Sequence, residues 1–75
     1  MSNEIKNNLR EKFLRAYANL PLNARREIIL VLEEKNERED IIKQPITWEI
    51  AYFEIRNNTS RSEKILDKLN ELKLI

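Results

Sequence analysis

The chain has 75 residues, of which 36% are charged and 41% hydrophobic, and its formal net charge is +1. A chain of this length houses one hydrophobic core, so the sequence predicts a single domain over residues 1–75. Because cysteine, histidine and glycine are absent, the residues exclude disulfides, thiolate metal sites, a histidine general base and glycine-rich phosphate loops.

These exclusions favour a non-catalytic protein with no cofactor, metal or small-molecule substrate. A chain without cysteine suits a reducing compartment, and no apolar run has the length of a signal peptide core or a membrane span. We therefore expect a cytoplasmic protein that does not enter a membrane. The high lysine, glutamate and arginine content is typical of thermophiles, although nine asparagines are not.

Residues 3–19 are predicted to form a first helix, because Leu9, Phe13 and Tyr17 recur at helical spacing. A second helix is expected after Pro21, which suits a first helical turn. Its sequence REIILVLEEKN, residues 26–36, contains an unbroken apolar run that is typical of a central helix with neighbours on several sides. The charged residues that follow are expected to form a connector with one short helical turn, ending before Pro45.

A third helix is predicted over residues 47–57, with Thr47 as its N-cap. It carries two apolar stripes, one formed by Trp48, Tyr52 and Ile55 and the other by Ile46, Ile50 and Phe53. Only one stripe is needed to bury the helix. Either both stripes lie in the core, or Trp48 and Tyr52 anchor a protein interface, since these residue types dominate binding hot spots.

The last helix lies within NNTSRSEKILDKLNELKLI, residues 57–75. Ser60 followed by Glu63 predicts a capping box at its start. With no glycine in the chain, asparagines such as Asn57 and Asn58 are the expected left-handed residues between helices. The apolar end, Leu74 and Ile75, is expected either to cover the base of the bundle or to dock into a partner.

Charged stripes on the last helix allow two interpretations. The basic residues Arg61, Lys64 and Lys68 recur at helical spacing beside an acidic stripe, so this surface is either a solvated face or a phosphate contact. The candidate nucleic-acid-binding residues are Arg56, Asn58, Arg61, Lys64 and Lys68.

A second charged group is the acidic run formed by Glu33, Glu34, Glu37, Glu39 and Asp40. It lacks the ligand spacing and central glycine of a calcium loop. A solvated connector is therefore the favoured interpretation, with docking onto a basic partner or weak binding of a divalent ion as the functional alternatives.

The segments REIILVLEE, PITWEIA and SRSEKILDKLNELKLI together resemble the three helices of winged-helix and related helix-turn-helix DNA-binding domains over residues 26–75. The resemblance implies a tri-helical unit in which the last helix reads DNA. Three features depart from the family pattern. The link FEIRNNT is longer than the family's tight turn and lacks glycine, Ser62 stands where the family buries an aliphatic residue, and the wing is absent.

The sequence thus predicts an all-α fold, a small four-helix bundle with a helix-turn-helix-like tri-helical unit. The predicted function is a non-catalytic accessory subunit that docks on and stabilises a larger intracellular complex, such as a polymerase or another nucleic-acid enzyme. Its expected protein-binding residues are Trp48, Tyr52, Ile55, Leu74 and Ile75. The alternative is a helix-turn-helix transcriptional regulator that contacts nucleic acid directly.

Overall fold

The computed structural model describes the backbone of residues 2–75 and the side chains of residues 7–75. Over this range the elements are α1 (Ser2–Ala18), the 3-10 turn η1 (Ala24–Arg26), β1 (Ile28–Lys35), β2 (Ile41–Thr47), α2 (Trp48–Arg56) and α3 (Ser62–Glu71). The strands form one antiparallel hairpin, so the fold is α+β. The predicted all-α four-helix bundle is wrong.

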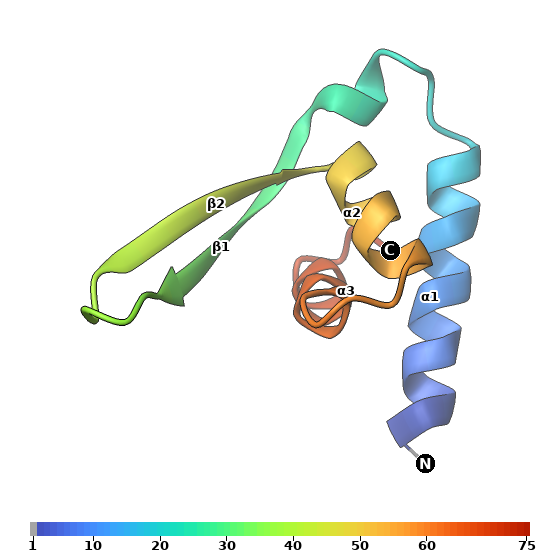
Figure 1. The fold of residues 1–75 in the computed structure, drawn as a ribbon. Helices are drawn as coiled ribbons and strands as arrows, with labels where there is room; N and C mark the ends of the chain where they lie inside the picture. The colour runs from blue at the N-terminus through green and yellow to red at the C-terminus, as the bar shows by residue number, and fades with distance from the viewer. Residues whose placement is uncertain (1) are drawn as a thin grey trace.

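The three helices lie together and form a body, from which the hairpin projects to one side (Figure 1). The end of the hairpin nearest η1 and α2 adjoins the helices, and the turn between the strands lies farthest from them. We call residues 33–43, the outer half of the hairpin, the arm. The protein therefore consists of a helical body and one projecting arm.

The hairpin occupies the segment that was predicted to be the second helix. In β1 the residues alternate, since Leu30 and Leu32 are buried whereas Val31 and Glu33 are exposed. An apolar run of five residues fits either a buried helix or a strand, and β-branched residues favour the strand. The predicted connector supplies the pairing partner, β2. The helix-turn-helix-like unit therefore lacks its first helix.

The hairpin closes through a short loop between Asn36 and Asp40. The Asn36 side-chain oxygen Oδ1 accepts hydrogen bonds from the backbone amides of Arg38 and Asp40, both at 2.9 Å. Glu39 has a φ of 63°, which is the left-handed conformation that ends a common three-residue hairpin loop. Asn36 therefore serves as a loop organiser and not as a helix stop.

The start and end of α2 agree with the sequence prediction. The Thr47 hydroxyl oxygen accepts a hydrogen bond from the Ile50 amide at 3.1 Å, which confirms Thr47 as the N-cap. At the other end, Asn58 has a φ of 53°. Its neighbour Thr59 donates its amide to the carbonyl of Glu54 at 3.1 Å, as in a Schellman stop.

The predicted capping box of the last helix is wrong, because α3 begins at Ser62 and its N-cap position is Arg61, which makes no side-chain capping bond. The left-handed stop at Asn58 turns the chain, and residues 59–61 form a further turn before the helix starts. The hydroxyl of Ser62 donates to the carbonyl of Thr59 at 2.7 Å. Ser60 is exposed and lies outside the helix.

One hydrophobic core joins the helices to the inner face of the hairpin. Its buried members are Leu9, Phe13, Leu30, Leu32, Ile46, Trp48, Ala51, Ile55, Ile65, Leu66 and Leu69. These residues come from both strands and from all three α-helices of the described chain. Within residues 2–75, no helix combines the length and apolar character needed to span a membrane.

Candidate protein-binding surface

The aromatic stripe that was expected to anchor a partner packs inside the protein. Trp48 and Ile55 are buried, and the Trp48 ring stacks on Phe13 with 5.8 Å between centroids. Tyr52 is half-buried and stacks on Tyr17, with centroids 4.2 Å apart and the ring planes 9° apart. These contacts hold α2 against α1, so this stripe does not form a free surface.

The opposite stripe of α2 faces solvent. Phe53 is 63% exposed and Ile50 is 40% exposed, and the two are one helical turn apart on the same face. We call Ile50 and Phe53 the outer α2 stripe. The residues that follow on the inner face, Ala51 and Ile55, are both fully buried. The sequence showed that α2 carries two stripes, and the fold decides which of them is outside.

The C-terminal residues divide between the core and the surface. Ile75 is partly buried and packs against the core, whereas Leu74 is exposed. The Leu74 amide donates to the carbonyl of Leu69 at 2.9 Å, and the residue between the helix and Leu74, Lys73, has a φ of 58°. This closed helix end folds the tail back onto the body, so only Leu74 of the predicted pair faces outward.

Arg61, a predicted nucleic-acid contact, is partly exposed and belongs to a polar cluster around the buried Glu54. Its guanidinium lies 3.2 Å from the carboxylate of Glu54, which is buried, and donates a hydrogen bond to the side-chain carbonyl of Gln44. The Thr59 hydroxyl also donates to the Glu54 carboxylate. The cluster joins β2, α2 and the start of α3. The positive charge of Arg61 is therefore paired with the Glu54 carboxylate of the same chain.

Three of the other four predicted nucleic-acid contacts also take part in local structure. The Arg56 guanidinium donates to the Tyr52 hydroxyl at 2.6 Å, and Asn58 supplies the left-handed stop of α2. Lys68 lies 4.0 Å from Glu71 and is half-buried. Lys64 is exposed on α3. The structure therefore does not present the five residues as one free basic surface.

A column of aromatic rings and cations lies between α1, α2 and η1. The Arg25 guanidinium lies 4.3 Å from the centroid of the Tyr17 ring and donates to the Tyr17 carbonyl at 3.3 Å. Tyr17 stacks on Tyr52, and the Arg56 guanidinium lies 5.8 Å from the centroid of the Tyr52 ring. These contacts hold α1, α2 and η1 together, so the aromatic rings and cations contribute to packing.

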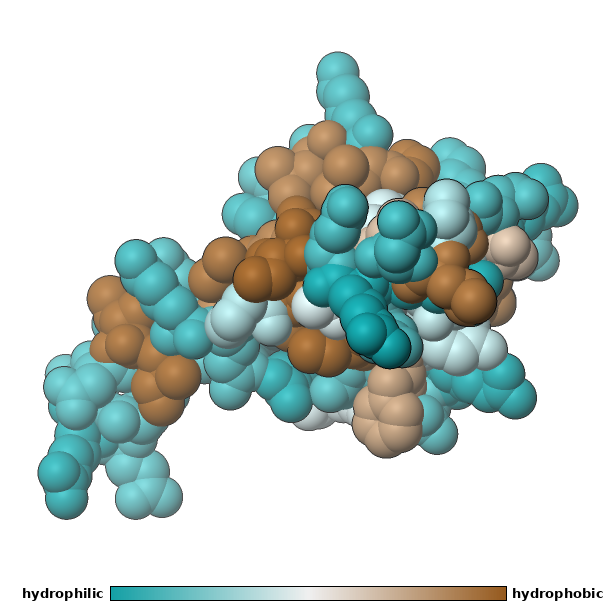
Figure 2. All heavy atoms as spheres, turned by 90° about the horizontal axis from the view of Figure 1, so that it is seen from above, coloured by the Kyte–Doolittle hydropathy of each residue, from teal (hydrophilic) through white to brown (hydrophobic). Residues whose placement is uncertain are grey.

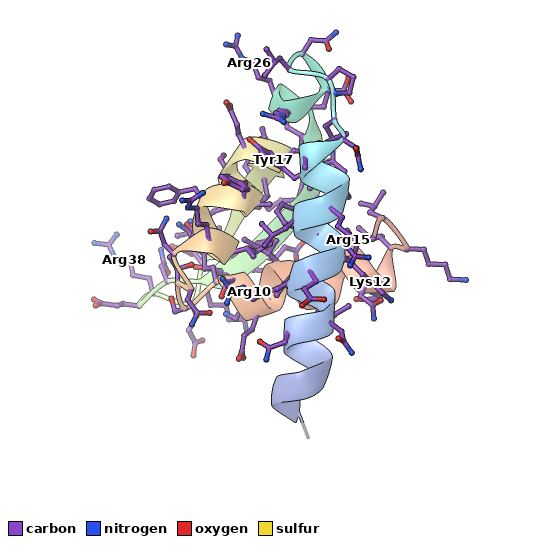
Figure 3. All side chains as sticks on the ribbon, turned by 90° about the vertical axis from the view of Figure 1, so that its right-hand side faces the viewer. Arg10, Lys12, Arg15, Tyr17, Arg26 and Arg38 are labelled. Atoms are coloured by element: carbon purple, nitrogen blue, oxygen red, sulfur yellow. The ribbon has the colours of Figure 1, made fainter. Side chains whose placement is uncertain are left out.

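Figure 3 shows how the basic residues of the N-terminal half are arranged around this column. Tyr17 lies on the side of α1 that faces α2, whereas Lys12 and Arg15 project from the opposite side of the helix. Arg26 extends from η1, and Arg38 lies far from it at the tip of the hairpin. The cations are spread over the molecule and do not form a single patch in this view.

The outer face of the hairpin is a second exposed apolar surface. The strand register places Ile28, Val31, Glu33, Lys35, Ile41, Lys43 and Pro45 on the face that points away from the core. Ile28 and Ile41 are 61% and 60% exposed, and Val31 is 43% exposed. We call these seven residues the outer hairpin face. Figure 2 shows hydrophobic residues along the projecting hairpin up to its hydrophilic tip.

The acidic run is distributed around the arm. Glu33 lies on the outer hairpin face, Glu34 is half-buried on the other face, and Glu37, Glu39 and Asp40 are exposed in the loop. Among the described residues, no group of three or more carboxylates is positioned to hold a metal ion.

The comparisons with known protein families, curated protein sequences and solved structures give no match for this chain. Its surfaces are therefore interpreted from its own residues. Sequence reasoning considered Phe53 only as a packing residue. It also missed the outer hairpin face, although the alternation in the segment LVLEEK and the β-branched residues of IIKQPIT were available signals.

Proposed function

We propose that this chain is a non-catalytic protein-binding module, an accessory subunit that docks on a larger cytoplasmic protein through the outer α2 stripe. One observation carries the proposal: Phe53, in the middle of a short helix, leaves most of its ring in water beside the exposed Ile50. Burial of a large aromatic side chain in a partner's pocket is a common source of binding free energy.

The stripe suits recognition of a helix by an apolar groove. Ile50 and Phe53 are separated by three positions, which is the spacing of anchors in helix-in-groove complexes. Polar residues border them, since Glu49 and Asn57 are exposed. The side-chain amide nitrogen of Asn57 donates to the Phe53 carbonyl at 2.8 Å. An apolar centre with a polar rim is the usual anatomy of a protein interface.

The helix that carries the stripe is also held rigidly. Thr47 caps its start, Asn58 closes its end, and Tyr52 is stacked against Tyr17 on its inner side. A preorganised helix loses less conformational entropy on binding. The DNA-binding alternative has weaker support, because Arg61 and Arg56 are already engaged by neighbouring side chains.

The proposal is tested by capturing partners from a native extract with the tagged full chain, in parallel with the variant Phe53→Ser. We expect wild type to retain a larger protein at fixed stoichiometry, and the variant to bind it about 30-fold more weakly, as for loss of a hot spot worth about 2 kcal/mol.

The matched control is Leu22→Ser, because Leu22 is 78% exposed but lies near η1 and outside the stripe. This variant should retain the partner as wild type does. Equal recovery by Phe53→Ser and wild type, with both chains folded by circular dichroism, would contradict the proposal.

A further inference from the structure

We propose that the outer hairpin face binds a second copy of this chain, in a two-fold symmetric dimer whose axis runs parallel to the strands. The face is distinct from the outer α2 stripe, so this inference goes beyond the proposed function and does not depend on it.

The two faces of the hairpin are covered unequally. On the inner face Leu30, Leu32 and Ile46 are buried against the helices. On the outer face Ile28 and Ile41 remain mostly in water and Val31 is 43% exposed, whereas the exposed isoleucine of the inner face, Ile42, lies in the arm and is 41% exposed. A two-stranded ribbon is marginally stable without a covering layer, and a second sheet packed face to face is a common solution.

The register of the hairpin makes this face complementary to itself. Val31 pairs with Pro45, and the next row toward the turn pairs Glu33 with Lys43. An axis parallel to the strands places β1 of one copy over β2 of the other, row by row. Each Glu33 then lies over Lys43 of the second copy, each Val31 lies over Pro45, and each Lys35 lies over Ile41.

Other arrangements lose this complementarity. An axis that crosses the strands at the charged row would place β1 over β1, and Glu33 would then face Glu33 of the second copy. Such like-charge contacts are unfavourable across an interface. An axis that crosses the strands between the Glu33 and Lys35 rows would pair these two charges, but it would place Val31 over the charged loop. The parallel axis pairs Glu33 with Lys43 and Val31 with Pro45 together, and the net charge of +1 leaves little overall repulsion between copies.

Addition of a strand at the edge of the hairpin is less favourable than packing on its face. The Asn36 amide donates to the Asp40 carbonyl at 3.1 Å, and hydrogen-bonded pairs alternate along an antiparallel ladder from that point. This alternation places Pro45 in a pair whose backbone groups point outward. The outer edge of β2 therefore lacks a donor at its centre, which discourages pairing there.

The dimer is tested by sedimentation equilibrium of the full chain over a concentration series. We expect the apparent mass to rise with concentration from 9.1 kDa toward twice that value, because a dimer held by one face of a two-stranded hairpin dissociates on dilution. The variants Glu33→Lys and Lys43→Glu should each weaken association by about tenfold or more, since both place like charges across the axis.

An equimolar mixture of these two variants gives the decisive result. In a mixed dimer, lysine at position 33 faces glutamate at position 43 of the other chain, and Lys43 of the first chain faces Glu33 of the second. Both contacts are again attractive, so association should return. Within each variant the cross-strand pair stays like-charged, so a repaired hairpin cannot explain the recovery. Glu63→Lys, the same charge change at an exposed position on α3, should leave the wild-type dimer unchanged.

A second measurement applies to the wild-type chain and does not depend on how the variants fold. Carbodiimide cross-linking of mixed isotope-labelled and unlabelled chains should give Glu33–Lys43 cross-links between chains of different labels. A chain that stays monomeric at every concentration, or a mixture of variants that does not recover, would overturn the dimer. Neither result would affect docking through Phe53.

Discussion

At the scale of single residues, charges that look available in the sequence are engaged in the fold. The clearest case is Arg61, which the helical spacing groups with Lys64 and Lys68 on a basic stripe. In the structure its guanidinium neutralises the buried carboxylate of Glu54 and also bonds Gln44. A spacing rule locates a residue on a helix face, but the neighbour across that face is set by other parts of the chain.

We therefore expect Arg61→Ala to destabilise the protein although it removes a surface charge. The substitution leaves Glu54 buried beside the Thr59 hydroxyl without its cation. Because Arg61 is partly exposed, we place the loss at about 1–2 kcal/mol in the free energy of unfolding, below that of a fully buried pair. Urea denaturation measures it.

The control for this prediction is Lys64→Ala, on the same helix but exposed. We expect a change within about 0.5 kcal/mol. Equal stability of the two variants would show that the Arg61 cluster contributes nothing. DNA binding is a separate measurement on the same variant. Salt-dependent binding by wild type that is lost in Lys64→Ala would support the DNA-binding regulator.

At the scale of secondary structure, local signals predicted α1 and both ends of α2, but they failed at the start of α3, where the predicted capping box is wrong, and over the hairpin. The spacing of Leu9, Phe13 and Tyr17 predicted the first helix, and Thr47 and Asn58 act at the ends of α2 as their side chains suggest. These signals depend on residues within a few positions of one another.

The hairpin could not be predicted in the same way. Its strand pairing joins residues 28–35 to residues 41–47, and the apolar run at its start fits a helix equally well. The absence of glycine also concealed the turn, since Glu39 takes the left-handed conformation that glycine or asparagine usually occupies.

Asn36 organises the hairpin loop, so its substitution should change the stability of the arm. Asn36→Ala removes the acceptor of two backbone amides. Asn36 begins the loop between the strands, and this turn is the part of the hairpin farthest from the helices (Figure 1). We expect local opening of the arm to become easier by about 1–2 kcal/mol, because its side chains share few contacts with the body.

Amide hydrogen exchange measures this change residue by residue. Protection of the β1 and β2 amides in the arm should fall, whereas protection of core amides in α2 and α3 should change little. A uniform loss over the whole chain would instead show that the arm unfolds only together with the helices.

At the scale of the whole molecule, one core decides which surfaces are free. Leu30, Leu32 and Ile46 fix one face of the hairpin on the helices, and Trp48 and Ile55 fix one face of α2. The outer hairpin face and the outer α2 stripe are among the apolar surfaces that this packing leaves exposed. Both surfaces are therefore consequences of how the elements pack, and neither is a property of one segment.

Two phenylalanines test this division directly. Phe13 is fully buried, whereas Phe53 is 63% exposed. We expect Phe13→Ala to lower the free energy of unfolding by about 3–5 kcal/mol, which is the usual cost of truncating a buried phenylalanine. Phe53→Ala should change it by no more than about 0.5 kcal/mol.

Guanidinium denaturation of the two variants checks the prediction. A large loss of stability in Phe53→Ala would mean that its ring packs inside the fold and cannot serve as a docking anchor. A small loss of unfolding free energy in Phe13→Ala would mean that the stacking of Phe13 on Trp48 and Tyr17 contributes little to the core.

The sequence by itself determined the helical character of residues 3–19 and 47–57, the cap at Thr47, the presence of two apolar stripes on α2 and the absence of thiol or imidazole chemistry. These properties depend on residue type and short-range spacing. Only the tertiary structure decided that residues 26–36 pair as a strand, that Phe53 and not Trp48 faces solvent, and that Arg61 serves Glu54. Each of these outcomes depends on contacts between segments that are distant in the chain, where packing against one shared core selects among locally equivalent alternatives.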